Sequence, residues 1–143
     1  MLKVAVDFDG TIVENAYPAI GKPLLFAFET LKAMQRRGLL LILWTVRSGE
    51  SLDEAVEFCQ QHGVEFYAVN CNYPEETLDN ETPRKIEADI FIDDRNIGGF
   101  AGWSEVWQML FPEERNIAME GKVVARYKKP SFLSRIINKR RKR

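Results

Sequence analysis

The sequence of 143 residues contains one histidine and two cysteines. A disulfide framework is therefore excluded, because Cys59 and Cys71 can form one bridge at most. Cys59 falls on the apolar stripe of an expected helix, where a cysteine acts as a small hydrophobic residue, so we expect buried thiols. His62 stands at the expected end of that helix with no partner in the pattern, and we expect it to be structural or exposed.

Long apolar runs are also missing. No window approaches the 18 consecutive apolar residues that a membrane span needs. The start, MLKVAVDFDG, has an acidic residue where a signal peptide would have an uninterrupted apolar segment. These two observations predict a cytoplasmic protein.

Charge is distributed unevenly along the chain. Residues 128–143 hold eight of the 20 Lys and Arg and none of the 21 Asp and Glu, so residues 1–127 carry twelve positive against 21 negative charges, a net −9. We expect one domain over 1–127, a size that can bury a real core, and a basic tail over 128–143. The tail has an apolar patch at helical spacing (Phe132, Leu133, Ile136 and Ile137), which suits nucleic acid, an anionic membrane surface or an acidic partner. A disordered, solubilising terminus is the alternative.

Strand-like and helix-like segments alternate along the chain. The strands are apolar throughout instead of alternating, which favours a parallel α/β sheet covered on both faces by helices. Expected strands are 3–8, 39–44, 65–69 and 88–92, with a further edge strand at 122–127. Expected helices are 23–37, a segment opened by a Ser51–Glu54 capping box and closed near Gly63, and 103–110.

Polar side chains follow three of these strands. Asp7 and Asp9 come after the first, Thr45 after the second, and Asp93 with Asp94 after the fourth. Ligands of open α/β sheets bind outside the carboxyl ends of the strands, so these side chains should converge on one crevice. Two carboxylates about 4 Å apart repel by roughly 4 kcal/mol at an effective dielectric of 20, which calls for a strong counter-charge. Carboxylate oxygens without histidine or thiolate favour Mg²⁺.

The alternative for each residue is a local structural role. Aspartate is common in turns, and a capped turn explains one member of the first pair but not both pairs. Threonine fits strands and turns in general, so Thr45 gains weight only from its place beside the aspartates.

These residues resemble a known family. DFDGT at 7–11, LILWT ending at Thr45, Lys85, and FIDD ending at Asp94 are similar, in this order, to the four motifs of the haloacid dehalogenase superfamily of phosphohydrolases. The match spans residues 2 to about 99 and implies an open, Rossmann-like parallel sheet.

The resemblance also implies a role for each motif residue. Asp7 would attack phosphorus and form an aspartyl-phosphate, and Asp9 would protonate the leaving oxygen and later activate water. Mg²⁺ would be held by Asp7 and Asp93, with Asp94 in support and the main-chain carbonyl of Asp9 facing the ion. The Thr45 hydroxyl and the Lys85 ammonium would bind the phosphoryl oxygens.

The positively charged residues near these motifs have alternative roles. Lys85 precedes the fourth strand, where it is either a phosphate ligand or a solvated surface residue, and Arg84 is the obvious substitute. Arg47 and Arg95 lie near the predicted crevice, and we expect local ion pairs from them in preference to substrate contacts.

Members of the family differ chiefly in an inserted cap. Here the intervals 12–22 and 70–84 are too short to form a domain, so we expect a small, capless molecule. Its crevice should be open unless the 70–84 loop or a second copy of the chain, in a homo-oligomer, covers it. Specificity contacts are expected from Tyr17 and Pro18 in the first interval and from Asn72 and Tyr73 in the second.

The function predicted on these grounds is Mg²⁺-dependent hydrolysis of a phosphomonoester, whose substrate is a nucleotide, a sugar phosphate or a nucleic-acid end. The alternative is a non-hydrolytic phosphate-binding or regulatory module of the same fold. The presence of both Asp7 and Asp9 favours the enzyme, because a binding module would not need the second. Transfer to an acceptor other than water stays open.

Overall fold

A computed structural model describes residues 1–114, and the chain divides into two compact units after Ala101. The first unit, Met1–Ala101, holds all the predicted site residues. The second begins at Gly102, and its described part contains α3, Trp103–Leu110, which matches the helix predicted at 103–110. The predicted edge strand at 122–127 and the basic tail at 128–143 lie outside the described residues. Within residues 1–114, every helix is too short or too polar to cross a membrane.

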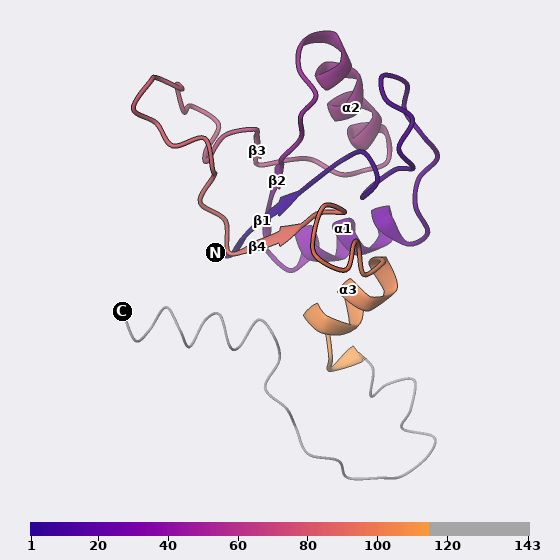
Figure 1. The fold of residues 1–143 in the computed structure, drawn as a ribbon. Coiled ribbons are helices and arrows are strands. Elements are labelled where there is room, and N and C mark those ends of the chain that lie inside the picture. Colours follow the sequence, from indigo (N-terminus) through magenta and orange to yellow (C-terminus); the bar gives the residue numbers. More distant parts are fainter. Residues whose placement is uncertain (115–143) are drawn as a thin grey trace, which may run out of the picture. The chain divides into compact units, whose positions relative to one another are not determined.

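The first unit is built on a four-stranded sheet (Figure 1). Its strands are β1 (Lys3–Val6), β2 (Leu40–Leu43), β3 (Ala68–Val69) and β4 (Ile90–Ile92), in the order β3-β2-β1-β4. Every pairing is parallel, which confirms the predicted α/β class. Strand β1 ends two residues earlier than predicted, because the carbonyl of Phe8 already accepts the N–H groups of Ile12 (2.9 Å) and Val13 (3.2 Å) in the following turn.

Both helices of this unit differ from prediction at their starts. Helix α1 is Ala27–Arg36, four residues shorter at its start than predicted, because Pro23 pairs with Val13 as an antiparallel bridge and cannot be helical. Helix α2 is Gly49–Gln61 with Ser48 at its N-cap. The predicted capping box is wrong, since the Ser51 hydroxyl lies inside the helix and donates to the Ser48 carbonyl (2.9 Å).

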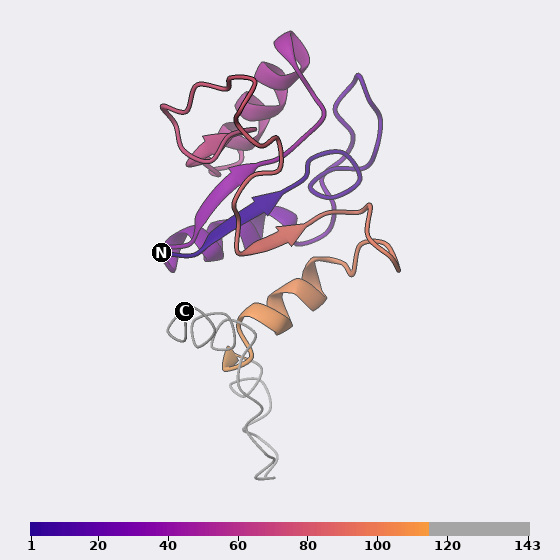
Figure 2. The ribbon, with the colours of Figure 1, turned by 60° about the vertical axis from the view of Figure 1, so that its left-hand side comes forward.

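Aromatic rings join α1 to α2. The His62 ring stacks on Phe28 of α1, with centroids 4.2 Å apart, and lies 4.4 Å from Phe58 of α2. A bond of 2.8 Å also joins His62 Nδ1 to the Phe58 carbonyl oxygen. In Figure 2, α1 runs behind the strands, and α2 lies at the top of the view. His62 is therefore a packing residue, as expected from its isolation in the sequence.

The opposite face of the sheet is covered by the connection between β3 and β4. Ala5, Ile42 and Ala68, which the strand register aligns across three strands, form a buried cluster with Ile86 from this connection. Trp44, Tyr67, Cys71 and Ala88 pack against the cluster. The segment 70–84 contains no helix or strand, and neither short interval builds a cap, as predicted. Cys71 and the fully buried Cys59 are free thiols, and burial raises the pKa of Cys59 to about 12.

Candidate active site

The parallel register brings the predicted residues to one edge of the sheet. Val6 pairs with Leu43 on one side and with Ile92 on the other, so β1, β2 and β4 end level with one another. A pocket of about 510 Å³ opens at this edge. Its lining includes Asp7, Asp9, Thr45 and Asp93, the residues at the strand ends, which we call the floor. Four of the predicted site residues therefore share one pocket.

Three carboxylates form a tight group beside this pocket. Asp7, Asp93 and Asp94 each offer an oxygen, and these oxygens lie within 4.8 Å of one another. All three side chains are half-buried. Asp94 Oδ1 is buried and, among the described residues, has no hydrogen-bond partner. Gly10, at φ +84°, lies so close that a Cβ there would overlap the Asp94 carboxyl group.

The environment of Asp7 disfavours its charged form. Burial is the main cause, and it raises the pKa of Asp7 from 3.8 to about 7. The nearby Asp93 and Asp94 raise it further, whereas hydrogen bonds from the Thr11 hydroxyl (3.0 Å) and the Phe8 backbone lower it. A carboxyl group with this pKa is about half ionised at neutral pH. A bound cation would restore the charge, because it favours the carboxylate.

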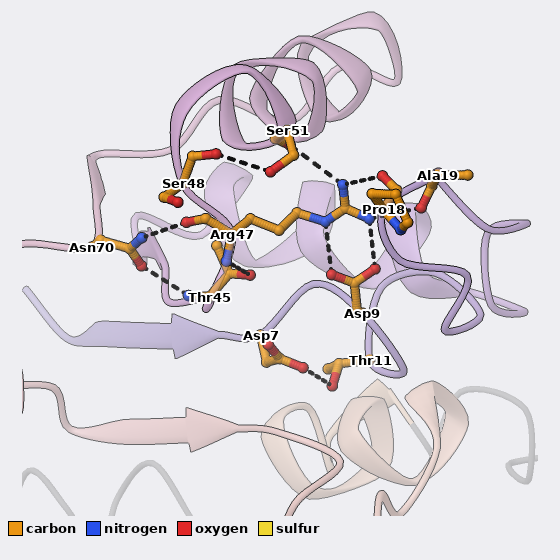
Figure 3. A network of polar contacts seen from close by, with 10 residues as sticks. All are labelled: Asp7, Asp9, Thr11, Pro18, Ala19, Thr45, Arg47, Ser48, Ser51 and Asn70. Carbon is orange, nitrogen blue, oxygen red and sulfur yellow. Dashed lines mark hydrogen bonds and ion pairs between the residues drawn. The ribbon is translucent and has the colours of Figure 1, made fainter.

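Asp9 belongs to a separate network centred on Arg47 (Figure 3). Arg47 is 1% exposed, and its Nε and Nη2 donate to the two oxygens of Asp9 at 2.7 and 2.8 Å. Its remaining N–H groups donate to the carbonyls of Pro18 (3.0 Å), Ala19 (2.7 Å) and Ser51 (3.3 Å). All five guanidinium donors are thus satisfied.

This network determines which interactions Asp9 and Arg47 can make. Both Asp9 oxygens accept from Arg47, and the group of three carboxylates does not include Asp9. The ion pair raises the pKa of Arg47 above its ordinary value. The expectation that Arg47 forms a local ion pair is confirmed. With no donor left, the guanidinium is not available to a substrate in this arrangement.

Thr45 is held in place by a residue that the sequence analysis missed. Asn70, directly after β3, accepts the Thr45 N–H on its Oδ1 (2.8 Å) and donates its Nδ2 to the Arg47 carbonyl (3.5 Å). The Thr45 hydroxyl accepts the Arg47 N–H (3.2 Å), which leaves its proton for a ligand. The signal was present, because Asn70 is the polar residue that follows the third strand, as Thr45 follows the second.

The predicted phosphate-binding cation is not among the residues that line the pocket. Lys85 is exposed, and its Nζ lies 5.8 Å from the ring centroid of Phe91 in β4. Arg84 is exposed as well and is also absent from the lining. Arg95 lines the pocket, and its backbone N–H donates to Asp93 Oδ1 (2.8 Å). Among the described residues, Arg95 is the cation placed at the mouth.

One of the residues expected to contact the substrate is among the remaining lining residues of the pocket, which we call the rim. Tyr17 lines it, together with Asn15, Trp44, Val46 and Arg95. Asn72 instead holds its own loop together, since its Nδ2 donates to Glu76 (2.8 Å) and its Oδ1 accepts the Glu87 N–H (2.6 Å). Pro18 contributes its backbone carbonyl, which accepts a hydrogen bond from Arg47. Trp44 and Val46 flank Thr45 in the sequence, which is the signal that could have identified them.

Comparison with known proteins gives one informative likeness. Neither a family model nor a curated protein matches this sequence. A solved structure, described as that of a conserved protein coded by a locus of Bacteroides thetaiotaomicron, is 50% identical with a TM-score of 0.72. The match covers 85% of this chain and 98% of the other, and the description of that protein states no activity. Identity at this level over almost the whole of the Bacteroides protein shows common ancestry, and the chain therefore belongs to the same protein family as the conserved protein of Bacteroides thetaiotaomicron.

Proposed function

We propose that the chain is a Mg²⁺-dependent phosphomonoesterase of the haloacid dehalogenase type, with Asp7 as the nucleophile. The observation that carries the proposal is the convergence of Asp7, Asp93 and Asp94, with Thr45 on the floor of the same pocket. Phosphoryl transfer depends mainly on positioning and on neutralising charge, and this set of groups is suited to both once a cation is bound.

The donor set fits Mg²⁺. It consists of hard carboxylate oxygens without histidine or cysteine. One oxygen of Asp94 is buried and has no hydrogen-bond partner among the described residues. Asp7, whose pKa is raised to about 7, needs a counter-charge to ionise fully at neutral pH. Asp7 and Asp93 would hold the ion, with Asp94 in support. When bound, Mg²⁺ would supply positive charge that offsets the phosphoryl oxygens and the carboxylates.

The proposed reaction begins at Asp7. One oxygen of Asp7 accepts from Thr11, and the other would attack phosphorus. The new O–P bond forms as the bond between phosphorus and the substrate alcohol breaks, which gives an aspartyl-phosphate. Water then attacks the same phosphorus, inorganic phosphate leaves, and the Asp7 carboxylate is restored. The Thr45 hydroxyl would donate to a phosphoryl oxygen.

Asp9 would give a proton to the departing alcohol and later take one from the attacking water. Both Asp9 oxygens accept from Arg47, so that proton would occupy a remaining lone pair of one of these oxygens. This pairing favours, as the second candidate, a phosphate-binding module in which Asp9 only supports the fold. Release of inorganic phosphate distinguishes the two candidates, because only the enzyme turns over its substrate.

The test is release of inorganic phosphate from a panel of sugar phosphates, nucleotides, nucleic-acid ends and phosphopeptides. We expect turnover with Mg²⁺, none in EDTA, and none in Asp7→Asn, whose amide cannot act as the nucleophile. Asp53→Asn, an exposed position on α2, is the matched control and should retain wild-type rates. Wild-type turnover in Asp7→Asn would refute the covalent step. Binding of the panel without turnover would favour the phosphate-binding module.

Three sequence predictions stay predictions under this proposal. They are a role for Lys85 in phosphate binding, contact of the basic tail at 128–143 with nucleic acid or an anionic membrane surface, and a cytoplasmic location.

A further inference from the structure

The rim of the pocket differs in character from its floor. The floor is made of carboxylates and Thr45, which would engage a phosphoryl group and a metal. The rim contains two aromatic rings, Tyr17 and Trp44, and the side chain of Val46, which is 84% exposed. At about 510 Å³ the pocket is in the range that holds a whole small molecule, and a phosphoryl group fills only a small part of it. The rim is therefore positioned to contact the alcohol part of the substrate.

Tyr17 is exposed, but its ring contacts a buried guanidinium. Its side chain is 59% exposed, yet the guanidinium carbon of Arg47 lies 5.2 Å from its ring centroid. The same guanidinium binds the carbonyls of the next two residues, Pro18 and Ala19, so the backbone beside the ring is fixed as well. A large aromatic side chain gains little fold stability when more than half of it faces water. A ring that is both fixed and exposed is preorganised for binding, because little freedom is lost when a ligand arrives.

Trp44 is fixed by a different contact. It packs against the buried cluster of Ala5, Ile42 and Ala68 on one face of the sheet and also lines the pocket. The two aromatic residues thus reach the rim from independent supports, one from the Arg47 network and one from the core of the sheet.

We infer that the substrate is a phosphomonoester whose alcohol carries a planar aromatic ring, such as a nucleoside monophosphate, and that Tyr17 is a specificity-determining residue that stacks on this ring. The inference rests on the proposed phosphomonoesterase. Aromatic faces stack favourably on planar rings, and bases in particular stack on aromatic side chains. Asn15 and Arg95, on the same rim, supply polar groups for the ring edge or the sugar.

The experiment compares substrates that share a phosphorylated ribose and differ only in the ring. Adenosine and uridine 5′-monophosphate are set against ribose 5-phosphate, with kcat/KM measured in excess Mg²⁺ for the full chain and for Tyr17→Ala and Tyr17→Phe. Base–aromatic stacking is worth about 1–3 kcal/mol, or about 5- to 150-fold. We expect Tyr17→Ala to lower kcat/KM for the nucleotides by that factor relative to kcat/KM for ribose 5-phosphate. Tyr17→Phe keeps the ring and should stay close to wild type.

Two results would overturn the inference. One is equal kcat/KM for nucleotides and ribose 5-phosphate in the wild-type protein, and the other is an equal loss for both in Tyr17→Ala, which would mean that Tyr17 only supports Arg47 and Asp9. Hydrolysis without ring preference would leave the phosphomonoesterase standing and refute the inference alone. If no substrate is hydrolysed, the proposed function fails, and calorimetric binding of the same compounds to the same variants tests the inference with the same expected ratios.

Discussion

Asp7 makes the stability of the metal-free protein depend on pH in a direction unusual for a carboxyl group. Its pKa is raised from 3.8 to about 7 on folding, chiefly by burial. The folded chain therefore binds this proton more tightly than the unfolded chain. The stability associated with the proton is fully present below pH 3.8 and is lost as the pH rises through about 7. We predict that replacing Asp7 by Asn removes this loss.

The size of the effect follows from the pKa difference. The pKa of Asp7 rises by about three, which corresponds to about 4 kcal/mol at 1.36 kcal/mol per pKa unit. Asp7 is only half-buried, so solvent screening reduces the expected loss, and we take about 2 kcal/mol. At a urea m-value of about 2 kcal/mol/M, this is a shift of about 1 M in the unfolding midpoint.

The assay is urea unfolding in EDTA at pH 4, 5.5 and 8, for wild type, Asp7→Asn and the control Asp53→Asn. The stability gained by Asp7→Asn relative to wild type should grow by about 2 kcal/mol between pH 4 and pH 8. The control should follow wild type at every pH. Adding Mg²⁺ at pH 8 should stabilise the wild type, because a ligand that binds only the folded state shifts the equilibrium, and should stabilise Asp7→Asn much less.

Parallel pH profiles for wild type and Asp7→Asn would refute this reasoning. They would mean that water or local relaxation solvates the Asp7 carboxylate as well in the folded chain as in the unfolded one.

Other perturbations test the remaining parts of the site. Arg47→Met should cost about 3–5 kcal/mol in urea unfolding, because it leaves the Asp9 carboxylate without its partner, and a loss under 1 kcal/mol would contradict the network. Asp9→Asn should slow hydrolysis by about 10² for poor leaving groups and less for good ones, so an equal loss across leaving groups would argue against an acid role. Because Asp93 lines the pocket and Asp94 does not, Asp93→Ala should weaken calorimetric Mg²⁺ binding more than Asp94→Ala, and the reverse order would reassign the direct ligand. Gly10→Ala should destabilise the fold by about 1–3 kcal/mol through its positive φ and its overlap with Asp94, and unchanged stability would show that the carboxyl group moves freely.

The parts of the fold that the sequence predicted well depend on local patterns of hydrophobicity. Apolar runs identified all four strands, although β3 and β4 are shorter than the predicted 65–69 and 88–92. The polar residues after the strands identified Asp7, Thr45 and Asp93 as neighbours in space. The starts of the helices were predicted less well. Pro23 and Ser51 are good helix-start residues in isolation. However, Pro23 pairs with Val13 outside α1, and α2 already begins at Gly49, before Ser51.

The network centred on Arg47 was predicted only in part from the sequence, because it depends on backbone groups. The pairing of Arg47 with Asp9 joins residues 38 positions apart, and three of its five bonds go to carbonyls that every residue possesses. Asn70 likewise acts on the backbone of Thr45 and Arg47. Such partners leave no mark in the residue types of the segments they bind.

The Arg47 network also bears on how a substrate reaches the pocket. One guanidinium joins the turn after β1, the carbonyls at Pro18 and Ala19, and the first turn of α2. Moving any of these segments alone would leave a buried charge partly unpaired, at a cost of several kcal/mol. The segment around Pro18 therefore cannot swing open by itself as a hinged flap. Val46 and Arg95, which also line the pocket, are exposed, and exposed side chains change rotamer within nanoseconds, so we expect neither of them to limit turnover.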